Sequence, residues 1–119
     1  MGLSDTTSPA YHLIAEGDDS KAAALFSEGH YMQVEVAAKL KGAKHPDLAD
    51  QFLAFMISDA FQKIIPDTNW MYPAVMPTEG LPTGFNTLIQ PEKSLLLSAE
   101  AAASVRNAAL AEWQTALSR

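Results

Sequence analysis

One segment of the chain, residues 31–40, alternates between a wholly apolar row and a mixed row of side chains. Met32, Val34 and Val36 belong to the apolar row. Because successive side chains of a strand point to opposite faces, this alternation predicts a half-buried β-strand that Gly42 ends. A single strand cannot make a sheet. We therefore expect its pairing partners to lie outside this chain or in a second copy of it.

A helix signal stands near the beginning of the chain. Residues 6–8 all carry hydroxyl groups, which cap free helix amides, and Pro9 suits a first helical turn. The pattern predicts a helix over residues 9–16, ended by Gly17. Its amino end has two interpretations: a plain helix cap, or a site that binds an anion or a hydrogen-bonding ligand.

Two later stretches also have helical spacing. A wide apolar stripe predicts a helix that opens at Pro46 and contains residues 48–56, and Ser58 begins a further helical segment that Pro66 is expected to stop. The alanine-rich residues 99–117 predict a long helix behind a serine cap. Helix, strand, helices, a long crossing and a final helix are together typical of an α/β protein.

A long segment without a regular pattern, residues 66–91, separates these helices. It is broken by Pro73, Pro77, Gly80, Pro82 and Gly84. Such a length is often functional or crosses between parts of a protein.

This segment starts with the polar turn of residues 67–73, which carries Trp70 and Tyr72. The two aromatic side chains either fill a hydrophobic core or form a wall for a flat or cationic ligand.

Composition excludes several classes of protein. The 119 residues suit one domain or part of a larger one, and 48% hydrophobic residues suffice for a core. The net charge of −6 and the scattered lysines and arginines argue against nucleic acid and anionic membranes as partners. There is no cysteine for a disulfide or a thiolate. We see neither a signal peptide at the start nor an apolar run of membrane-spanning length.

Catalytic and metal-binding patterns are weak. His12 and Glu16 stand four residues apart and share a helix face, but two such ligands do not make a metal site. His30 and Glu35 point to opposite faces of the expected strand, and nothing supplies a nucleophile. The residues therefore predict neither a metal site nor an enzyme.

Three separated motifs resemble a known family. Residues 3–12, 26–38 and 69–73 occur in the order found in the periplasmic thiamine-binding proteins of bacterial ABC importers. The similarity runs from Leu3 almost to the end of the chain and includes the Trp113 segment. It corresponds to the carboxy-terminal portion of that family, so the chain is expected to be truncated on its amino-terminal side.

This resemblance implies part of a type II periplasmic-binding-protein fold, in which two α/β lobes close on a ligand. Residues 1–30 are then expected in the second lobe, 31–38 in a hinge-crossing strand, 39–80 in the first lobe, and 81–119 in a return to the second lobe. The implied location is the periplasm. The implied partners are thiamine or its phosphates, as transported ligand and not as cofactor, and an inner-membrane ABC permease.

The resemblance also implies ligand-binding residues of two kinds. The polar loop residues and the aromatic contacts expected to bind thiamine are Asp5, Thr6, Thr7, Ser8, Tyr11, Trp70 and Tyr72. At Asp5 the family usually has tyrosine. An aspartate cannot stack on the ligand, although it can pair with the thiazolium charge.

Alternative functions differ in class from a transport protein. A stand-alone interaction domain without small-molecule binding would homodimerise through its exposed strand edge. An enzyme of the thiamine pathway would need an acid–base pair or nucleophile in the cleft. For the binding-protein hypothesis, we expect the isolated chain to bind thiamine weakly or not at all, because half a cleft cannot bury the ligand.

Overall fold

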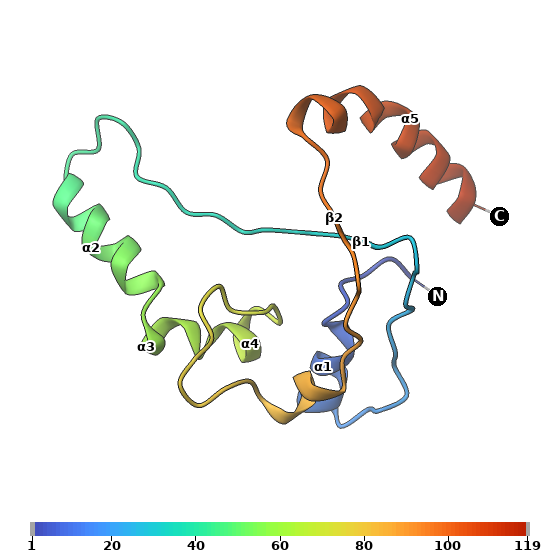
Figure 1. The fold of residues 1–119 in the computed structure, drawn as a ribbon, viewed down its shortest axis with the longest axis horizontal. Coiled ribbons are helices and arrows are strands. Elements are labelled where there is room, and N and C mark those ends of the chain that lie inside the picture. The colour runs from blue at the N-terminus through green and yellow to red at the C-terminus, as the bar shows by residue number, and fades with distance from the viewer. Residues whose placement is uncertain (1, 119) are drawn as a thin grey trace. The chain divides into compact units, whose positions relative to one another are not determined.

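The computed structural model describes residues 2–118 (Figure 1). The chain divides into two compact units, one containing residues up to 26 together with 34–90, and the other containing 27–33 and the residues from 91 onward. We describe each unit by itself. In chain order the elements are α1 (Ser8–Tyr11), η1 (His12–Glu16), β1 (His30–Tyr31), α2 (Pro46–Met56), α3 (Asp59–Gln62), α4 (Ile65–Thr68), η2 (Thr83–Thr87), β2 (Ser94–Leu95) and α5 (Ala99–Leu117).

The first unit begins with the predicted helix, whose cap differs from the prediction. Backbone carbonyls of Asp5 and Thr7 accept the amides of Ser8 and Ala10 at 3.1 and 3.0 Å, and no side chain caps the helix. Thr7 already has helical backbone angles, φ −90° and ψ −9°, and its side chain is buried. A capping side chain usually requires an extended backbone at this position, so the predicted hydroxyl cap is wrong.

The second half of this helix is a π-helical turn. After the α-helical residues of α1, the chain continues through η1, and the Gly17 amide donates to the carbonyl of His12, five residues earlier. Gly17 has φ 67°, a left-handed conformation that glycine adopts without strain, and it ends the turn. The predicted bounds of the helix are therefore confirmed, while its π-helical geometry was not predicted.

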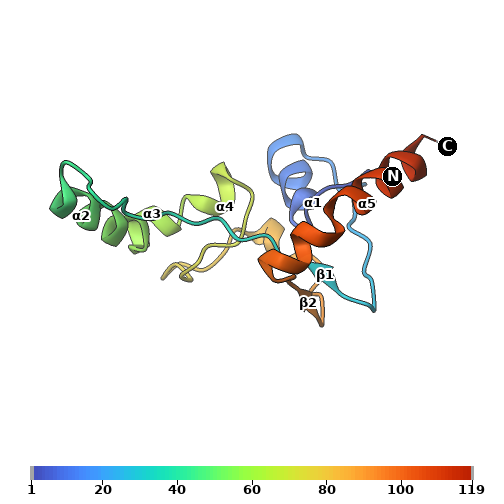
Figure 2. The same cartoon turned by 90° about the horizontal axis from the view of Figure 1, so that it is seen from above.

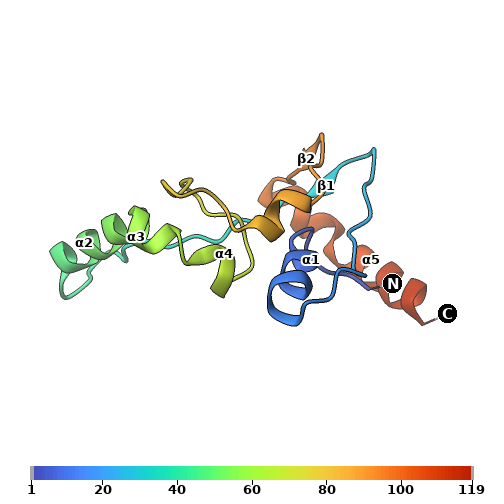
Figure 3. The same cartoon turned by 90° about the horizontal axis from the view of Figure 1, so that it is seen from below.

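A small core lies between α1 and η2. Ala10, Phe85 and Leu88 are buried and Leu81 packs against them. Figure 3 shows η2 beside α1, in agreement with the contacts between the two elements. The backbone of Gly84 lies so close to the Ile14 side chain that a Cβ atom on residue 84 would be 2.7 Å from it. This core supports the helix that carries Tyr11.

Helix α2 opens at Pro46 as predicted, but the outcome at Pro66 corrects the prediction. Pro66 lies in the first turn of α4 and is fully buried. A proline needs no amide hydrogen bond in a first turn, so it starts this short helix instead of stopping one. The chain has already left the preceding helix, α3, at Lys63.

Two polar side chains fasten the irregular segment to α3. Gln62 donates from Nε2 to the Met56 carbonyl at 2.6 Å and accepts the Val75 amide at 3.1 Å. Asp59 accepts the Thr78 amide at 2.6 Å, and this bond holds the pKa of Asp59 below its usual value. The long segment is therefore attached to the helices at two points.

The second unit contains one parallel pair of short strands, β1 and β2, with His30 opposite Ser94 and Tyr31 opposite Leu95 (Figure 2). The predicted strand over 31–40 is wrong beyond its first residue, although the Met32 amide still donates to the Leu95 carbonyl at 2.8 Å. Within the described residues, no strand pairs with residues 32–40. The apolar side chains of this segment remain exposed to water, and Val36 is 87% exposed.

Helix α5 agrees with the prediction at both ends. Ser98 has an extended backbone and its Oγ accepts the Ala101 amide at 3.2 Å, as a capping serine does. The apolar side chains Val105, Leu110 and Trp113 remain about half exposed. Among the residues that the structure describes, no helix combines the length and hydrophobicity needed to cross a membrane.

Candidate functional site

Two of the predicted aromatic contacts, Tyr11 and Trp70, lie against each other in the first unit. Their ring centroids are 5.1 Å apart and the ring planes make an angle of 80°, which is an edge-to-face contact. Tyr11 comes from the last residue of α1, and Trp70 from the turn that follows α4. The Tyr11 residue is 37% exposed and Trp70 is partly buried, so Tyr11 is the more accessible of the two.

Trp70 has an unusual backbone conformation. Its φ is 56°, and it is the only non-glycine residue with positive φ in the part of the chain that the structure describes. A bulky residue in the left-handed region costs of order 1–3 kcal/mol, and such strain gathers at functional sites. The neighbouring Asn69 helps to hold the turn by donating to a Glu35 carboxylate oxygen at 3.1 Å.

Tyr72 lies apart from this pair and against the core. Its ring makes an edge-to-face contact with Phe85 at 5.6 Å, and its hydroxyl accepts from Gln90 Nε2 at 3.2 Å. Tyr72 contacts the core through Phe85 but is still 41% exposed, and Trp70 is partly buried, so neither ring belongs wholly to a core or wholly to an exposed wall. The contact of Tyr72 with Phe85 was not visible in the sequence, because it depends on the path of the long segment.

The predicted polar loop has side chains of different accessibility. Asp5 is exposed, and Thr6 and Ser8 are partly exposed. Thr7 is only 5% exposed, and its backbone carbonyl is used by the Ala10 amide. Ser8 Oγ forms a hydrogen bond with Ser4 Oγ at 2.5 Å. Thr6 and Ser8 therefore have the more accessible hydroxyl groups of this loop.

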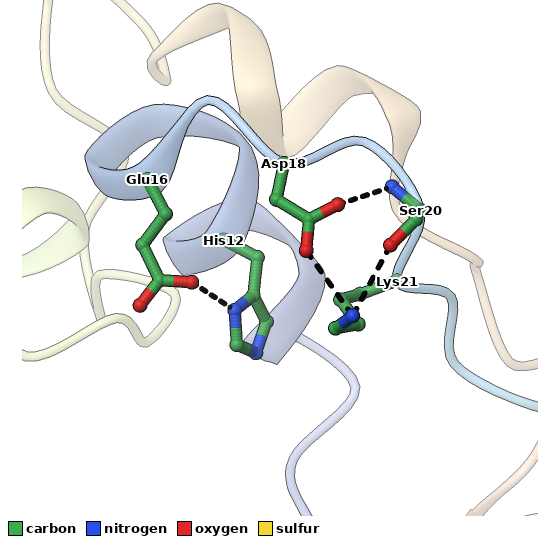
Figure 4. A network of polar contacts seen from close by, with 5 residues as sticks. All are labelled: His12, Glu16, Asp18, Ser20 and Lys21. Atoms are coloured by element: carbon green, nitrogen blue, oxygen red, sulfur yellow. Dashed lines mark hydrogen bonds and ion pairs between the residues drawn. The ribbon is translucent and has the colours of Figure 1, made fainter.

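A polar network follows Tyr11 along η1 (Figure 4). The Nδ1 atom of His12 and a carboxylate oxygen of Glu16 lie 2.7 Å apart, while the Asp18 carboxylate accepts from the Ser20 amide at 2.8 Å and pairs with Lys21 at 3.1 Å. The His12 ring also meets the Tyr11 ring edge to face at 5.2 Å. The aromatic pair and the polar network are thus continuous.

The charges of this network alter three acid–base equilibria. The hydrogen bond from His12, supported by one from Tyr11, lowers the pKa of Glu16. The hydrogen bond to Glu16 and the negative charge of that carboxylate raise the pKa of Tyr11. Hydrogen bonds from Ser20 and Lys21 hold the pKa of Asp18 well below its usual value. The network therefore favours a carboxylate at Glu16 beside a neutral phenol at Tyr11.

His12, Glu16 and Asp18 also have the geometry of a possible cation site, since their ligand atoms lie within 4.8 Å of one another. Each of these groups already has a protein partner, and the Lys21 ammonium supplies the positive charge next to Asp18. A metal ion would have to displace that ammonium. We therefore assign no metal to this cluster.

A separate cavity of about 330 Å³ in the first unit is not lined by the predicted site residues. Its walls include Pro9, Leu13, Lys21 and Leu88. Pro9 and Leu13 stand four residues apart on one side of the helix, and Tyr11 lies between them in sequence on another side. The aromatic pair and this cavity are therefore two different features.

A partly exposed aromatic pair, with partly exposed hydroxyl groups near the start of the helix that carries Tyr11, suits a surface that binds a small molecule. Comparison with known proteins specifies the class. The chain is 53% identical over 117 residues to the thiamine-binding periplasmic proteins of Salmonella typhimurium and Escherichia coli, and the alignment covers 98% of this chain and 35% of each relative. The protein of the same name from Brucella suis is 48% identical over 120 residues, which are 36% of its length.

The structural comparison gives the same result. A solved structure of a periplasmic thiamin binding protein matches this chain with a TM-score of 0.77 and 53% identity, over 96% of this chain and 35% of the solved one. No protein-family model matches the chain. The chain is therefore homologous to about a third of the length of thiamine-binding periplasmic proteins, and the resemblance stated from its motifs is confirmed. The names of these relatives describe binding and not catalysis.

Proposed function

We propose that this chain contributes part of a thiamine-binding site to a periplasmic solute-binding protein that delivers its ligand to an ABC permease. The observation that carries the proposal is the identity of about half the residues to thiamine-binding periplasmic proteins over almost the whole chain. The contact between Tyr11 and Trp70 supports it, because the two residues inferred as aromatic ligand contacts lie together on the surface.

The chemistry of thiamine suits the aromatic pair. Thiamine is flat and carries a permanent positive charge, so it can stack on aromatic rings and gain about 0.5–2 kcal/mol from cation–π attraction. In an edge-to-face pair the ring that contributes its edge keeps both of its own faces uncovered by its partner. The net charge of −6 also favours a cationic ligand over an anionic one.

The polar loop supplies the second part of the proposed site. We assign hydrogen bonds to thiamine to Thr6, Thr7 and Ser8 and an electrostatic role to Asp5. The partial exposure of Thr6 and Ser8 supports their role, whereas the Thr7 side chain would have to act from a buried position. Tyr72 is assigned an indirect role beside the core in addition to its proposed ligand contact.

We further propose that the remaining wall of the cleft is contributed by polypeptide outside this chain. The chain spans about a third of the length of the relatives it matches, and the proposed complete protein has two α/β lobes. In that arrangement residues 1–30 and 81–119 belong to one lobe, residues 39–80 to the other, and residues 31–38 cross between them. Lobe closure would bury the ligand and shift the protein to its closed state.

Calorimetric titration tests the site. The E. coli relative is rebuilt with this chain in place of its matching third and titrated with thiamine, thiamine monophosphate and thiamine diphosphate. Saturable binding of thiamine or one of its phosphates is expected, with a loss of at least tenfold in affinity for Trp70→Ala, since a stacked aromatic contact is worth ~1.4 kcal/mol or more here. Trp113→Ala, a tryptophan of α5, is the matched control and should bind as the unsubstituted hybrid does.

Titration of the 119-residue chain alone tests whether the thiamine site also needs polypeptide from outside this chain. We expect weak heat or none, because the chain spans about a third of its relatives and the proposed cleft needs a second wall from outside it. An affinity for the isolated chain equal to that of the hybrid would refute the two-walled site. A folded hybrid that binds no thiamine compound would refute the proposed function itself.

A further inference from the structure

The turn that carries Trp70 lacks the hydrogen bond that usually stabilises a left-handed residue after a helix. Helix α4 ends at Thr68, and Asn69 and then Trp70 follow it. A left-handed residue in this place is usually glycine, and its amide donates to a carbonyl of the last helical turn. Within the described residues the Asn69 amide donates to the Ile65 carbonyl at 2.9 Å, but the Trp70 amide makes no hydrogen bond. The conformation of Trp70 therefore depends on side-chain contacts.

The side chain of Asn69 spans this turn. Its Nδ2 atom lies 3.1 Å from a Glu35 carboxylate oxygen and 3.3 Å from the Met71 sulfur atom. Asn69 and Met71 flank Trp70, so the second contact joins the two sides of the strained residue. The first contact joins the turn to a residue 34 positions earlier in the chain. One amide group therefore closes the turn on itself and attaches it to Glu35.

The carboxylate of Glu35 determines which way the Asn69 amide points. An ionised carboxylate only accepts hydrogen bonds, whereas a side-chain amide has a donating nitrogen and an accepting oxygen. The nitrogen of Asn69 is therefore the atom that can pair with Glu35. The same nitrogen suits Met71, because a thioether sulfur is a weak acceptor and cannot donate. Rotation of the amide by half a turn would break both contacts, and Glu35 opposes that rotation.

The segment that carries Glu35 is attached to the same unit at a second point. Lys39 Nζ lies 2.6 Å from a carboxylate oxygen of Asp50 in α2. Glu35 and Lys39 are four residues apart, while Val36 between them is 87% exposed. Polar side chains thus connect this extended segment to α2 and to the turn after α4, and its most exposed apolar side chain makes no part of that attachment.

We propose that Glu35 is a positioning residue of the ligand site: through Asn69 it holds the turn that presents the Trp70 ring to Tyr11. The two rings lie edge to face with their centroids 5.1 Å apart. The proposal deepens the proposed thiamine site and rests on it for the identity of the ligand. Because residues 31–38 are also the segment proposed to cross between the lobes, this hydrogen bond connects the crossing to a turn that contacts the ligand.

Trp70 fluorescence of the 119-residue chain tests the positioning without a ligand. Trp113→Phe removes the other tryptophan, so the emission reports Trp70. Glu35→Ala should shift this emission, because the Asn69 amide loses its partner. Glu35→Gln should emit as the unsubstituted chain does, because the glutamine oxygen still accepts from Asn69. Glu92→Ala, the same substitution at another exposed glutamate, is the control and should leave the emission unchanged.

Two outcomes of the fluorescence experiment would refute the positioning role. Circular dichroism establishes that each variant is folded, as expected for substitutions at an exposed residue. The first outcome is unchanged Trp70 emission in folded Glu35→Ala. The second is an equal shift in Glu35→Ala and Glu35→Gln, since the charge of Glu35 and not its hydrogen bond would then act on Trp70.

Ligand affinity distinguishes the positioning role from the proposed function. In the hybrid protein, Glu35→Ala should weaken thiamine binding by roughly three- to tenfold, the effect of one net hydrogen bond, and Glu35→Gln by less than about twofold. Unchanged affinity in Glu35→Ala would overturn the role in the ligand site. Absence of thiamine binding in the unsubstituted hybrid would refute the proposed function, and the fluorescence of the 119-residue chain would still decide whether Glu35 holds the turn.

A double substitution tests whether Glu35 acts through Asn69. In a hybrid that already carries Asn69→Ala, the further substitution Glu35→Ala should cause no additional loss of thiamine affinity, because the hydrogen bond is already absent. A further loss of threefold or more, judged against the roughly three- to tenfold effect of one hydrogen bond, would show that Glu35 acts by another route and would overturn the proposal.

Discussion

Trp70 is the residue at which backbone strain and proposed function coincide. Its left-handed backbone conformation, with φ 56°, presents the indole to Tyr11. Asparagine adopts this conformation more readily than tryptophan does. A substitution at this position can therefore separate the effect of backbone strain from the effect of the ring contact with Tyr11.

Trp70→Asn tests this separation. Relief of strain of order 1 kcal/mol should offset part of the lost aromatic contact and burial of the partly buried indole, so Trp70→Asn should lower the free energy of unfolding less than Trp70→Ala does. Thiamine binding by the hybrid protein should nevertheless weaken at least tenfold, as in Trp70→Ala. Denaturant unfolding and calorimetry measure the two quantities. Retained affinity would show that the indole is not a ligand contact.

The pKa shifts of Tyr11 and Glu16 predict that the stability of the folded chain decreases at both acidic and alkaline pH. Because the pKa of Glu16 is lowered in the folded chain, its stabilisation is present above the ordinary glutamate pKa and is lost as the pH falls through the lowered one. Because the pKa of Tyr11 is raised, its stabilisation is present below the ordinary tyrosine pKa and is lost as the pH rises through the raised one.

In a chain with Trp113→Phe, Trp70 is the remaining tryptophan. Its fluorescence emission should therefore change at an acidic and at an alkaline pH, with a plateau between them. In Glu16→Gln the acidic change should disappear and the alkaline change should move to lower pH. A pH profile identical in the two proteins would contradict the assigned contacts.

Among the elements, α5 depends most on its own sequence. Its bounds, Ala99–Leu117, follow from alanine-rich helix propensity and from the Ser98 cap, without a buried face. An isolated helix of this length is marginal in water, so the cap matters more than it would in a packed helix.

Ser98→Ala should destabilise α5 by about 1 kcal/mol, because the Ala101 amide loses its partner. The measured quantity is helix content by circular dichroism against temperature. Ser104→Ala is the control, since this serine lies inside the helix and its Oγ donates to the Ala101 carbonyl. An equal loss of helix in both variants would contradict a specific role for the cap.

At the scale of the whole molecule, the buried core is small compared with the exposed apolar surface. The described core consists of Ala10, Phe85 and Leu88, whereas Val36, Leu40 and Leu48 are more than 60% exposed. Exposed apolar side chains in such number mark surfaces that other polypeptide covers. This agrees with a chain that spans a third of its relatives.

We therefore expect the isolated chain to associate in solution. Sedimentation equilibrium should give an average mass above the 12.8 kDa of one chain, decreasing on dilution. Val36→Lys together with Leu40→Lys should reduce this association, and Glu92→Lys, which makes the same change of charge at an exposed residue, serves as the control for charge alone. A folded chain that stays monomeric at every concentration would contradict this expectation and the homodimer hypothesis with it.

The sequence by itself determined the features that depend on neighbouring residues. Proline in a first turn, a capping serine and helical apolar spacing specified where α2 and α5 begin and end, and three ordered motifs specified the homology. Such signals act over a few residues, so they do not require knowledge of the fold.

Only the tertiary structure decided which distant residues meet. It paired Tyr11 with Trp70, placed Tyr72 on Phe85, and limited β1 to two residues because no further described strand completes a ladder beside it. The π-helical turn, in which the Gly17 amide donates to the His12 carbonyl, also has no signature at α-helical spacing. These features depend on the path of the chain in space, and hydrophobic periodicity describes one element at a time.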